Sequence, residues 1–310
     1  MTLREPPKKS QAANLVGRFA GLVMLLGLFA VVIWTVATNQ QAAAIQRSDP
    51  LVHAPGQYVD TPRGALHVVT VGEGSVPMVA IHHDTIAGGA PLVPLASELA
   101  ERDRRVILPD LLSYGFSPRP VSPGRRLSTT GQAESVAELL DELGEAPYEV
   151  VGFGEGGEVA TELAVLRPDL TSRLVLVDTP DLPVPSDGVE TLEGLPFGVG
   201  EAVAYTYDGA APGALQRFQD ECPSWAHCEG EVLEHYRRAS AVPGTAEAIH
   251  VRRASDPAFV APSRLDEISV DVLVVAVGTS REEAANLAER FPQGEAQNAS
   301  ASELADVLAG

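Results

Sequence analysis

Four side chains that could move protons or hold a metal follow two short apolar runs of the chain. His82, His83 and Asp84 come directly after one run, and Glu155 follows the other. If both runs are parallel strands of one sheet, their carboxyl ends meet at the edge where ligands bind in open α/β sheets. Imidazole and carboxylate groups at such an edge could form an acid–base or metal cluster. The plainer interpretation is that one histidine turns into the fold and that Asp84 and Glu155 cap helix N-termini.

The two cysteines, Cys222 and Cys228, lie six residues apart. A short loop can close this spacing as a disulfide in an oxidising compartment. A zinc site that includes the neighbouring His227 and His235 is the alternative, but structural zinc sites usually show a second closely spaced pair of ligands. The spacing therefore favours a disulfide, and we expect no metal and no other cofactor.

An uncharged apolar segment runs from Phe19 to Thr38. At about 1.5 Å per residue, a helix of this length crosses the hydrocarbon core of a bilayer, which is about 30 Å thick. Four basic residues lie within residues 1–18, and none follows the segment until Arg47. The positive-inside rule then predicts a single-pass protein of the cell membrane, with its N-terminus in the cytoplasm and its main domain outside.

A cleavable signal peptide is the alternative to a membrane anchor. Three consecutive alanines at 42–44 offer a cleavage site with small residues. The apolar segment is longer than the hydrophobic region of about 7–15 residues that signal peptides usually carry, which favours the anchor. Both interpretations export the domain that follows.

The composition excludes a disordered chain and argues against nucleic-acid binding. The chain has 310 residues, of which 45% are hydrophobic, and its formal net charge is −20. Such a chain can bury a sizeable core. An acidic protein repels phosphate backbones unless it carries a local basic patch, and no such patch follows the N-terminal segment.

Beyond a polar, Pro-containing stalk at residues 39–55, β-branched runs alternate with segments of helical apolar spacing. The runs of strand length are Ala65–Val71, Pro77–Ile81, Arg105–Leu108, Tyr148–Gly152, Arg173–Val177 and Val272–Val277. The helical segments between them are Leu92–Glu101, Gln132–Leu143 and Glu158–Arg167. This alternation predicts an α/β domain over residues 56–310, with a doubly wound, mostly parallel sheet and helices on both faces.

The alternation stops between about residues 180 and 263. This stretch is rich in Pro and Gly and holds short helical patches at Gly230–Ala239 and Thr245–Arg253. An insertion of this length between two strands predicts a helical cap over the sheet edge, with a surface excursion as the plainer alternative. Trp225 is expected to belong to the core of this cap rather than to clamp a ligand.

Three segments of the chain carry a resemblance to a known family. They are VILPDLLSYGFS, LDELGEAPYEVVGFGEGG and EHYRRASAVPGTAEAIHVRRAS. The first is similar to a strand and loop of the pattern D-x-x-G-x-G-x-S, with Asp110, Tyr114, Gly115 and Ser117 in place. From about residue 56 to its end, the chain resembles the α/β-hydrolase superfamily, in particular the capped branch of epoxide hydrolases and haloalkane dehalogenases.

The resemblance implies a degenerate catalytic site. The nucleophile elbow of such hydrolases reads G-x-S-x-G, or carries Asp or Cys at its centre, whereas this chain has Gly154 at that position. All seven histidines precede residue 251, so the loop expected at EAQNASASELADVL provides no general base. Asp178 could serve as the acid in some layouts of the family. Without a nucleophile and a base, it has nothing to orient.

The oxyanion hole is also altered in this resemblance. The usual His-Gly pair is replaced by His82-His83, although the backbone N–H groups near His83 and Glu155 could still point inward. The carboxylate of Glu155 beside these donors would disfavour a developing oxyanion. Glycine at position 154 adopts a positive φ without the strain that a nucleophile bears at an elbow.

These features predict a membrane-anchored, catalytically inactive protein that binds a small apolar ligand or a protein partner. The alternative is an ester or epoxide hydrolase with rearranged groups at His82, His83, Asp84 and Glu155. A third interpretation is a structural ectodomain of a larger membrane complex.

Overall fold

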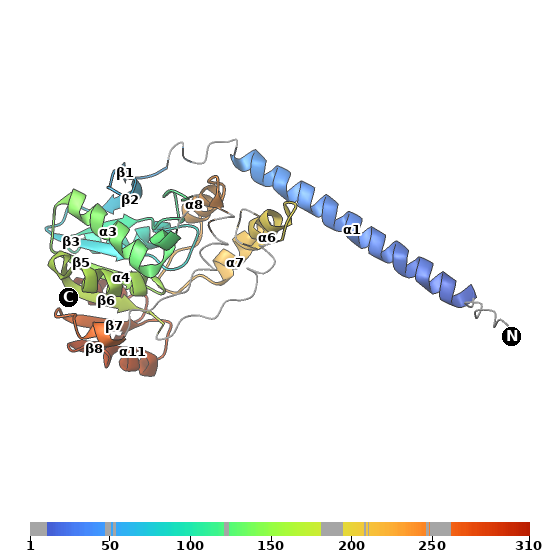
Figure 1. Cartoon of the computed structure of the whole chain (residues 1–310). Coiled ribbons are helices and arrows are strands. Elements are labelled where there is room, and N and C mark those ends of the chain that lie inside the picture. The colour runs from blue at the N-terminus through green and yellow to red at the C-terminus, as the bar shows by residue number, and fades with distance from the viewer. Residues whose placement is uncertain are drawn as a thin grey trace, which may run out of the picture.

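Within the residues that the computed structural model describes, eight strands form one sheet, and one long helix projects from the domain (Figure 1). The described residues are 11–46, 51, 54–120, 124–180, 195–207, 209, 211–245, 248 and 262–310.

The sheet is mixed and mostly parallel. Its strands are β1 (Gln57–Val59), β2 (Leu66–Val71), β3 (Val76–Ile81), β4 (Arg104–Pro109), β5 (Tyr148–Phe153), β6 (Thr171–Val177), β7 (Val272–Ala276) and β8 (Gly294–Asn298). Their order is β1-β2-β4-β3-β5-β6-β7-β8, with β2 antiparallel to both of its neighbours and the remaining pairs parallel. Because β3, β5, β6 and β7 are successive neighbours, the residues that follow them meet at one edge.

Helices cover both faces of the sheet, which confirms the predicted layering. The helices are α2 (Val93–Ala100), α3 (Thr129–Leu143), α4 (Gly156–Leu166), α11 (Arg281–Ala288) and α12 (Leu304–Ala309), with short helical turns at Ala90–Leu92, Gly124–Leu127, Pro168–Leu170 and Pro262–Leu265. Apolar side chains of α3, α4 and α11 share one core cluster with the sheet, and those of α2 and α12 share another. The central strands β5, β6 and β7 are buried on both faces, as their continuous apolar runs require.

Local capping explains where two of these helices begin and end. The Ser128 hydroxyl accepts a hydrogen bond from Gly131 N at the start of α3, and Gly144 ends this helix in the left-handed region at φ +70°. At the start of α11, Ser280 and Glu283 form a reciprocal capping box.

Three described helices are inserted between β6 and β7: α6 (Val199–Tyr207), α7 (Pro212–Asp220) and α8 (Glu231–Ser240). α8 corresponds to the predicted patch at 230–239, whereas most of the predicted patch Thr245–Arg253 lies outside the described residues. Tyr236 and Ala239 of α8 pack against Ile86 and Phe116, which belong to the loops after β3 and β4. The inserted helices therefore lie over the carboxyl edge of the sheet.

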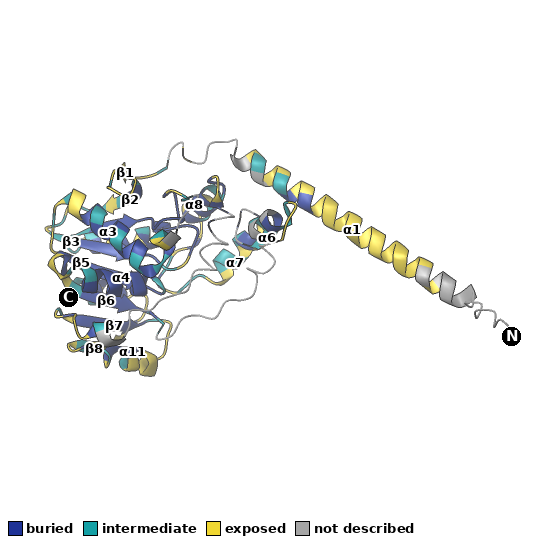
Figure 2. Cartoon of the chain, viewed as in Figure 1, coloured by how far each residue is buried: buried dark blue, intermediate teal, exposed yellow. Residues whose placement is uncertain are grey.

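The long helix α1 (Gln11–Gln46) contains the predicted apolar span. Its apolar part lies within Arg18–Gln41, where the most apolar 18 residues have a mean hydropathy of 2.5, and this part is exposed over most of its length (Figure 2). The length and composition of this part fit a membrane anchor and a signal sequence alike. The helix continues through residues 39–46, where the sequence analysis placed a stalk, because alanine and glutamine are strong helix formers.

Both edges of the sheet differ from the sequence-based expectation. β1 and β8 were not predicted, and the stretch EAQNASASELADVL, expected to be a loop, forms β8, a short loop and α12. β1 has only three residues, and most side chains of β8 are exposed. Neither strand therefore shows the apolar run by which a buried strand is predicted.

A buried ion pair ties β2 to the loops at the carboxyl edge. His67 Nδ1 lies 2.7 Å from Asp110 Oδ2, and both side chains are almost fully buried. The Asp110 carboxylate also accepts hydrogen bonds from Gly89 N and Phe116 N, each at 2.8 Å. Burial raises the pKa of Asp110, but the hydrogen bond and charge of His67 outweigh it and hold this pKa well below its ordinary value. Burial lowers the pKa of His67, and the partner carboxylate again outweighs it, so this pKa is raised.

We expect Asp110→Asn to lower the free energy of unfolding by about 3 kcal/mol, because it leaves buried donors without a charged acceptor. The depressed pKa of Asp110 contributes stability above the unfolded value of about 4, and the raised pKa of His67 contributes it below about 6.5. The loss should therefore be largest between these pH values. Urea unfolding of the detergent-solubilised protein measures it.

The matched control is Asp306→Asn, which breaks an exposed pair with Arg102. It should cost less than about 1 kcal/mol. Equal losses for the two variants would show that the buried pair does not hold these loops.

Candidate functional site

The turn between β5 and α4 brings three elements into very close contact. A Cβ added to Gly152 would lie 2.4 Å from the Cα of Gly157, and one added to Gly156 would lie 2.3 Å from the carbonyl oxygen of His82. Real Cβ atoms do not approach other atoms so closely, so glycine is required at these positions. The turn itself is sharp, since Gly154 at its centre has φ +52°.

The turn at Gly154 has the backbone of a nucleophile elbow but carries no nucleophile. Gly154 N donates to Val177 O at 2.9 Å, and Gly157 N donates to Gly154 O at 3.0 Å. A Cβ added to Gly154 would lie 3.1 Å from the Cβ of His83. The side chain of His83 therefore borders the space into which a nucleophile would project.

His82 is a structural side chain in this arrangement. Its Nε2 accepts a hydrogen bond from Leu111 N at 3.1 Å, and its Nδ1 lies 2.7 Å from the carbonyl oxygen of His83. These partners assign the neutral tautomer with the proton on Nδ1. The ring also packs edge-on against Tyr114, with 4.9 Å between ring centroids.

His83 is held neutral. Burial and the neighbouring His82 lower its pKa to about 4, against a smaller opposing effect of Asp84. Among the described residues, its buried Nδ1 has no hydrogen-bond partner. A catalytic histidine is oriented by a carboxylate at this atom, and His83 is not.

Asp178 follows β6, in the left-handed region at φ +46°. Its carboxylate accepts hydrogen bonds from Val277 N and Gly278 N at 2.8 Å each, from Thr279 N at 3.1 Å and from Thr279 Oγ1 at 2.9 Å. The indole Nε1 of Trp225 donates to Asp178 Oδ2 at 2.9 Å. The candidate acid of the resemblance is therefore paired with a tryptophan, and this pairing was missed by the sequence analysis.

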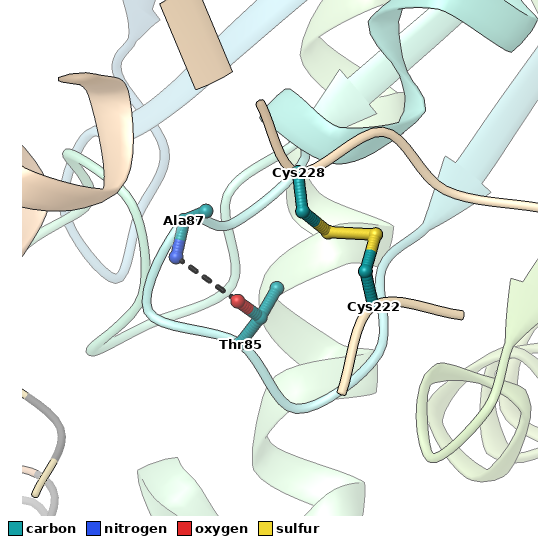
Figure 3. The surroundings of a disulfide bond; sticks show 4 residues. All are labelled: Thr85, Ala87, Cys222 and Cys228. Carbon is teal, nitrogen blue, oxygen red and sulfur yellow. Dashed lines mark hydrogen bonds between the residues drawn. A yellow bond between two sulfur atoms is a disulfide. The ribbon is translucent and has the colours of Figure 1, made fainter. Parts of the chain in front are cut away.

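Trp225 lies on a short loop closed by a disulfide between Cys222 and Cys228, whose Cα atoms are 6.0 Å apart. Figure 3 shows this disulfide together with Thr85 and Ala87 of the loop after β3. At the end of the loop, His227 N donates to Pro91 O at 3.0 Å.

The indole of Trp225 packs at the edge of the sheet. Its ring lies 5.1 Å from that of His83, edge-on, and 5.0 Å from that of Phe153. Trp225 is 7% exposed and belongs to the core cluster that α2 and α12 share with the sheet, whereas it was expected in the core of the inserted helices. Side chains thus fill the space beside the elbow.

The acidic residues Asp84 and Glu155 lie near one another at the elbow. Glu155 Oε2 accepts a hydrogen bond from Asp84 N at 3.3 Å, and Asp84 itself is exposed. Glu158, a buried carboxyl group in the first turn of α4, was not among the predicted site residues. Burial, and to a lesser extent the charge of Glu155, raise the pKa of Glu158 to about 7.

Among the described residues, no group of three His, Cys, Asp or Glu side chains is arranged to hold a metal ion. The zinc alternative fails for the cysteines, because both are in the disulfide. His235 lies on α8, packs against Phe116 and has a pKa lowered to about 4, chiefly by burial.

Two further features bear on ligand binding and catalysis. The residues that follow β8, at 299–303, read Ala-Ser-Ala-Ser-Glu, so no histidine occupies the loop from which the resemblance expects a base. An apolar cavity of about 10 Å³ lies between the sheet and α2, lined by residues such as Met78, Leu95 and Phe153. It has room for about one water molecule and for no organic ligand.

Comparison with known proteins identifies the fold. A family model described as alpha/beta hydrolase fold matches residues 81–216. The chain is 34% identical over 124 residues to a 2-hydroxymuconate semialdehyde hydrolase of Pseudomonas putida, covering 40% of this chain and 43% of the relative. It is 32% identical over 169 residues to Lipase LipV of Mycobacterium tuberculosis, covering 54% of this chain and 59% of the relative. The matched region thus spans about half the length of these relatives.

Solved structures extend the likeness to most of the chain. A meta-cleavage product hydrolase from Pseudomonas fluorescens superposes with a TM-score of 0.63 at 15% identity, covering 82% of this chain and 96% of that one. The enol-lactonase from Burkholderia xenovorans superposes with a TM-score of 0.59 at 19% identity, covering 82% and 96%. The chain therefore has the α/β-hydrolase fold.

We expect Trp225→Phe to lower the free energy of unfolding by about 1.5 kcal/mol, because it keeps an aromatic ring and removes one donor to a carboxylate. Chemical unfolding of the sheet domain measures the change. Trp34→Phe, the same substitution at an exposed position of α1, should leave it unaltered. A Trp225→Phe variant as stable as the parent would show that the indole N–H contributes nothing.

Glu158→Gln should stabilise the protein at alkaline pH. An acid whose pKa is raised on folding favours the folded state below its unfolded value, and this contribution is lost as pH rises through about 7. The gain from Glu158→Gln should grow to about 2 kcal/mol between about pH 5 and pH 8. Glu282→Gln, on the exposed face of α11, is the control, and a gain that does not depend on pH would contradict the assignment.

Proposed function

We propose that the protein belongs to the α/β-hydrolase family, is anchored in the cell membrane by α1, and binds a partner without catalysing hydrolysis. The proposal rests on two observations taken together, the residue at the centre of the elbow and the hydrogen-bond partner of the acid. Gly154 stands where the nucleophile belongs, and the acid Asp178 is hydrogen-bonded to Trp225 where a hydrolase would present a histidine.

Hydrolysis through a covalent intermediate needs a nucleophile, a base to deprotonate it, and a group to orient the base. Gly154 provides no attacking atom. The five hydrogen bonds that Asp178 accepts from Trp225 and from residues 277–279 leave its carboxylate occupied. The nucleophile and the base of this chemistry are therefore lacking, and the orienting acid Asp178 is already engaged by other donors.

A hydrolase with rearranged groups is the alternative, and the geometry of its four residues opposes it. Both ring nitrogens of His82 contact the backbone, and His83 is neutral with no orienting carboxylate. The Glu155 carboxylate lies at the loop after β3, where a developing oxyanion would have to be stabilised. None of these groups is a base directed at a substrate position.

A protein partner is favoured over a small apolar ligand. His83, Phe153 and Trp225 pack against one another at the place where a hydrolase of this fold would hold its substrate. A ligand in the place of these three side chains would have to displace the loop that the disulfide and the hydrogen bond from His227 to Pro91 hold in place. A partner that contacts the outside of the inserted helices needs no such rearrangement.

The export of the domain rests on two features of the chain. The disulfide between Cys222 and Cys228 is the usual state of paired cysteines in oxidising compartments. The basic residues before α1 favour a cytoplasmic N-terminus. We infer that residues 56–310 lie outside the cell membrane.

The test is an assay of the full chain in detergent against short p-nitrophenyl esters and a styrene-oxide type epoxide. We expect no turnover above a buffer blank. Gly154→Ser should also be inactive, because the introduced hydroxyl has no base to deprotonate it.

Glu155→Gln and His83→Ala are the diagnostic variants of the same experiment. Turnover by the parent protein that either variant abolishes would overturn the proposal in favour of rearranged catalysis. Activity that appears in Gly154→Ser alone would show that a base is present after all.

A further inference from the structure

We propose that the apolar segment Leu195–Phe197, just before α6, inserts into the outer surface of the bilayer and holds the domain against the membrane. The segment is called the apex here. This inference rests on the proposed membrane anchor and adds a second contact with the lipid, made by the domain itself.

The first observation is the exposure of the apex. Phe197 is 95% exposed and Leu195 is 44% exposed. Apart from residues of α1, few large apolar side chains of the described residues are so open, and Phe197 is the most exposed of all. A large apolar side chain that projects into water favours transfer to an apolar phase.

The second observation is the level of the apex relative to the predicted span. α6 packs against α1, and Asn39 Nδ2 of α1 donates to Gly198 O at 3.1 Å. Asn39 is the first residue after the apolar segment that ends at Thr38. Figure 1 shows α6 beside α1. Phe197, the residue before Gly198, therefore lies where the hydrocarbon core would give way to the lipid headgroups.

The face of α1 that meets the domain confirms this level. Thr35 and Thr38 are buried and Asn39 is half-buried, whereas the other described side chains from Phe19 to Ala37 are exposed. Positions 35, 38 and 39 follow the i, i+3, i+4 spacing of one helix face. The contact with α6 is thus confined to the last turn of the span, which places the apex at the outer interface and no deeper.

The third observation is the backbone of the apex. Phe197 has φ +62°, in the left-handed region that a bulky side chain rarely adopts. In this conformation the ring points to the outside, where contact of an apolar ring with water does not stabilise the protein. Interfacial aromatic rings are typical of membrane proteins at this depth.

The chemistry of the apex points to the boundary between headgroups and acyl chains rather than to charged headgroups. Its residues are Leu, Pro and Phe, and the segment from 195 to 207 carries Glu201 and no basic residue. With a net charge of −20, the protein as a whole is repelled by anionic lipids. Binding at the apex is therefore apolar in origin.

The experiment reconstitutes the full chain in phosphatidylcholine vesicles whose acyl chains carry bromine, which quenches tryptophan fluorescence on contact. The background is Trp34→Phe, which removes the tryptophan of α1. Phe197→Trp is the probe, and Leu195→Trp repeats the test at the other end of the apex. Asn286→Trp, on the exposed face of α11, is the matched control.

We expect the added fluorescence of Phe197→Trp and Leu195→Trp to be quenched several-fold more than that of Asn286→Trp. Equal quenching of probes and control, in a chain that resists extraction by alkaline carbonate, would overturn the apex contact and leave the anchor standing. Extraction of the chain by the same wash would overturn the anchor of the proposed function, and this inference with it.

Discussion

The close approach of α4 to the ends of β3 and β5 is the constraint on which the site depends. Side chains at Gly152, Gly156 or Gly157 would collide with backbone or with Thr179. This close packing of α4 lets the central strands end at the same edge of the sheet. It also positions the loops that carry His83 and Asp178. It is a packing requirement of the sheet and its helix, so it does not depend on whether a nucleophile stands at position 154.

The same frame gathers hydrogen-bond donors around Asp178. Asp178 still faces the end of β7, but its carboxylate is bound by three backbone N–H groups, a hydroxyl and the Trp225 indole. Unpaired, a carboxylate at this partly buried position would carry a desolvation cost. The tryptophan provides the donor that a histidine would have provided, and its ring packs against His83 and Phe153. Trp225 and Phe153 at this edge of the sheet belong to the core cluster that α2 and α12 share with the sheet.

The elements with strong local patterns could be predicted from the sequence. The six predicted strands correspond to β2 to β7, and the predicted helices to α2, α3 and α4, because buried strands and two-faced helices leave apolar periodicity in the chain. The edge strands β1 and β8 could not, since short or exposed strands leave no such periodicity. The helical conformation of residues 39–46 within the predicted stalk could not be predicted, because composition alone does not distinguish a polar helix from a linker.

The decisive pairs of the site have no local signal. Trp225 and Asp178 are 47 residues apart in the chain, and His67 and Asp110 are 43 apart. The sequence gives the residue types at such positions, but their pairing depends on how the inserted helices and the loops fold over the sheet. Glu158 is similar, because the i, i+3 spacing from Glu155 is visible, whereas the burial that raises its pKa is not.

Glycine at position 154 explains how the elbow turn stays sharp without backbone strain. A non-glycine residue held at positive φ costs of the order of 1 kcal/mol, which catalysis makes tolerable in an active hydrolase. Gly154 avoids this strain. Glycine is more flexible in the unfolded chain, however, and ordering it on folding costs a comparable free energy. The two effects nearly cancel, so selection for stability alone does not restore a side chain at this position. The 3.1 Å approach to His83 adds a steric cost to any replacement, and that cost decides the balance in favour of glycine.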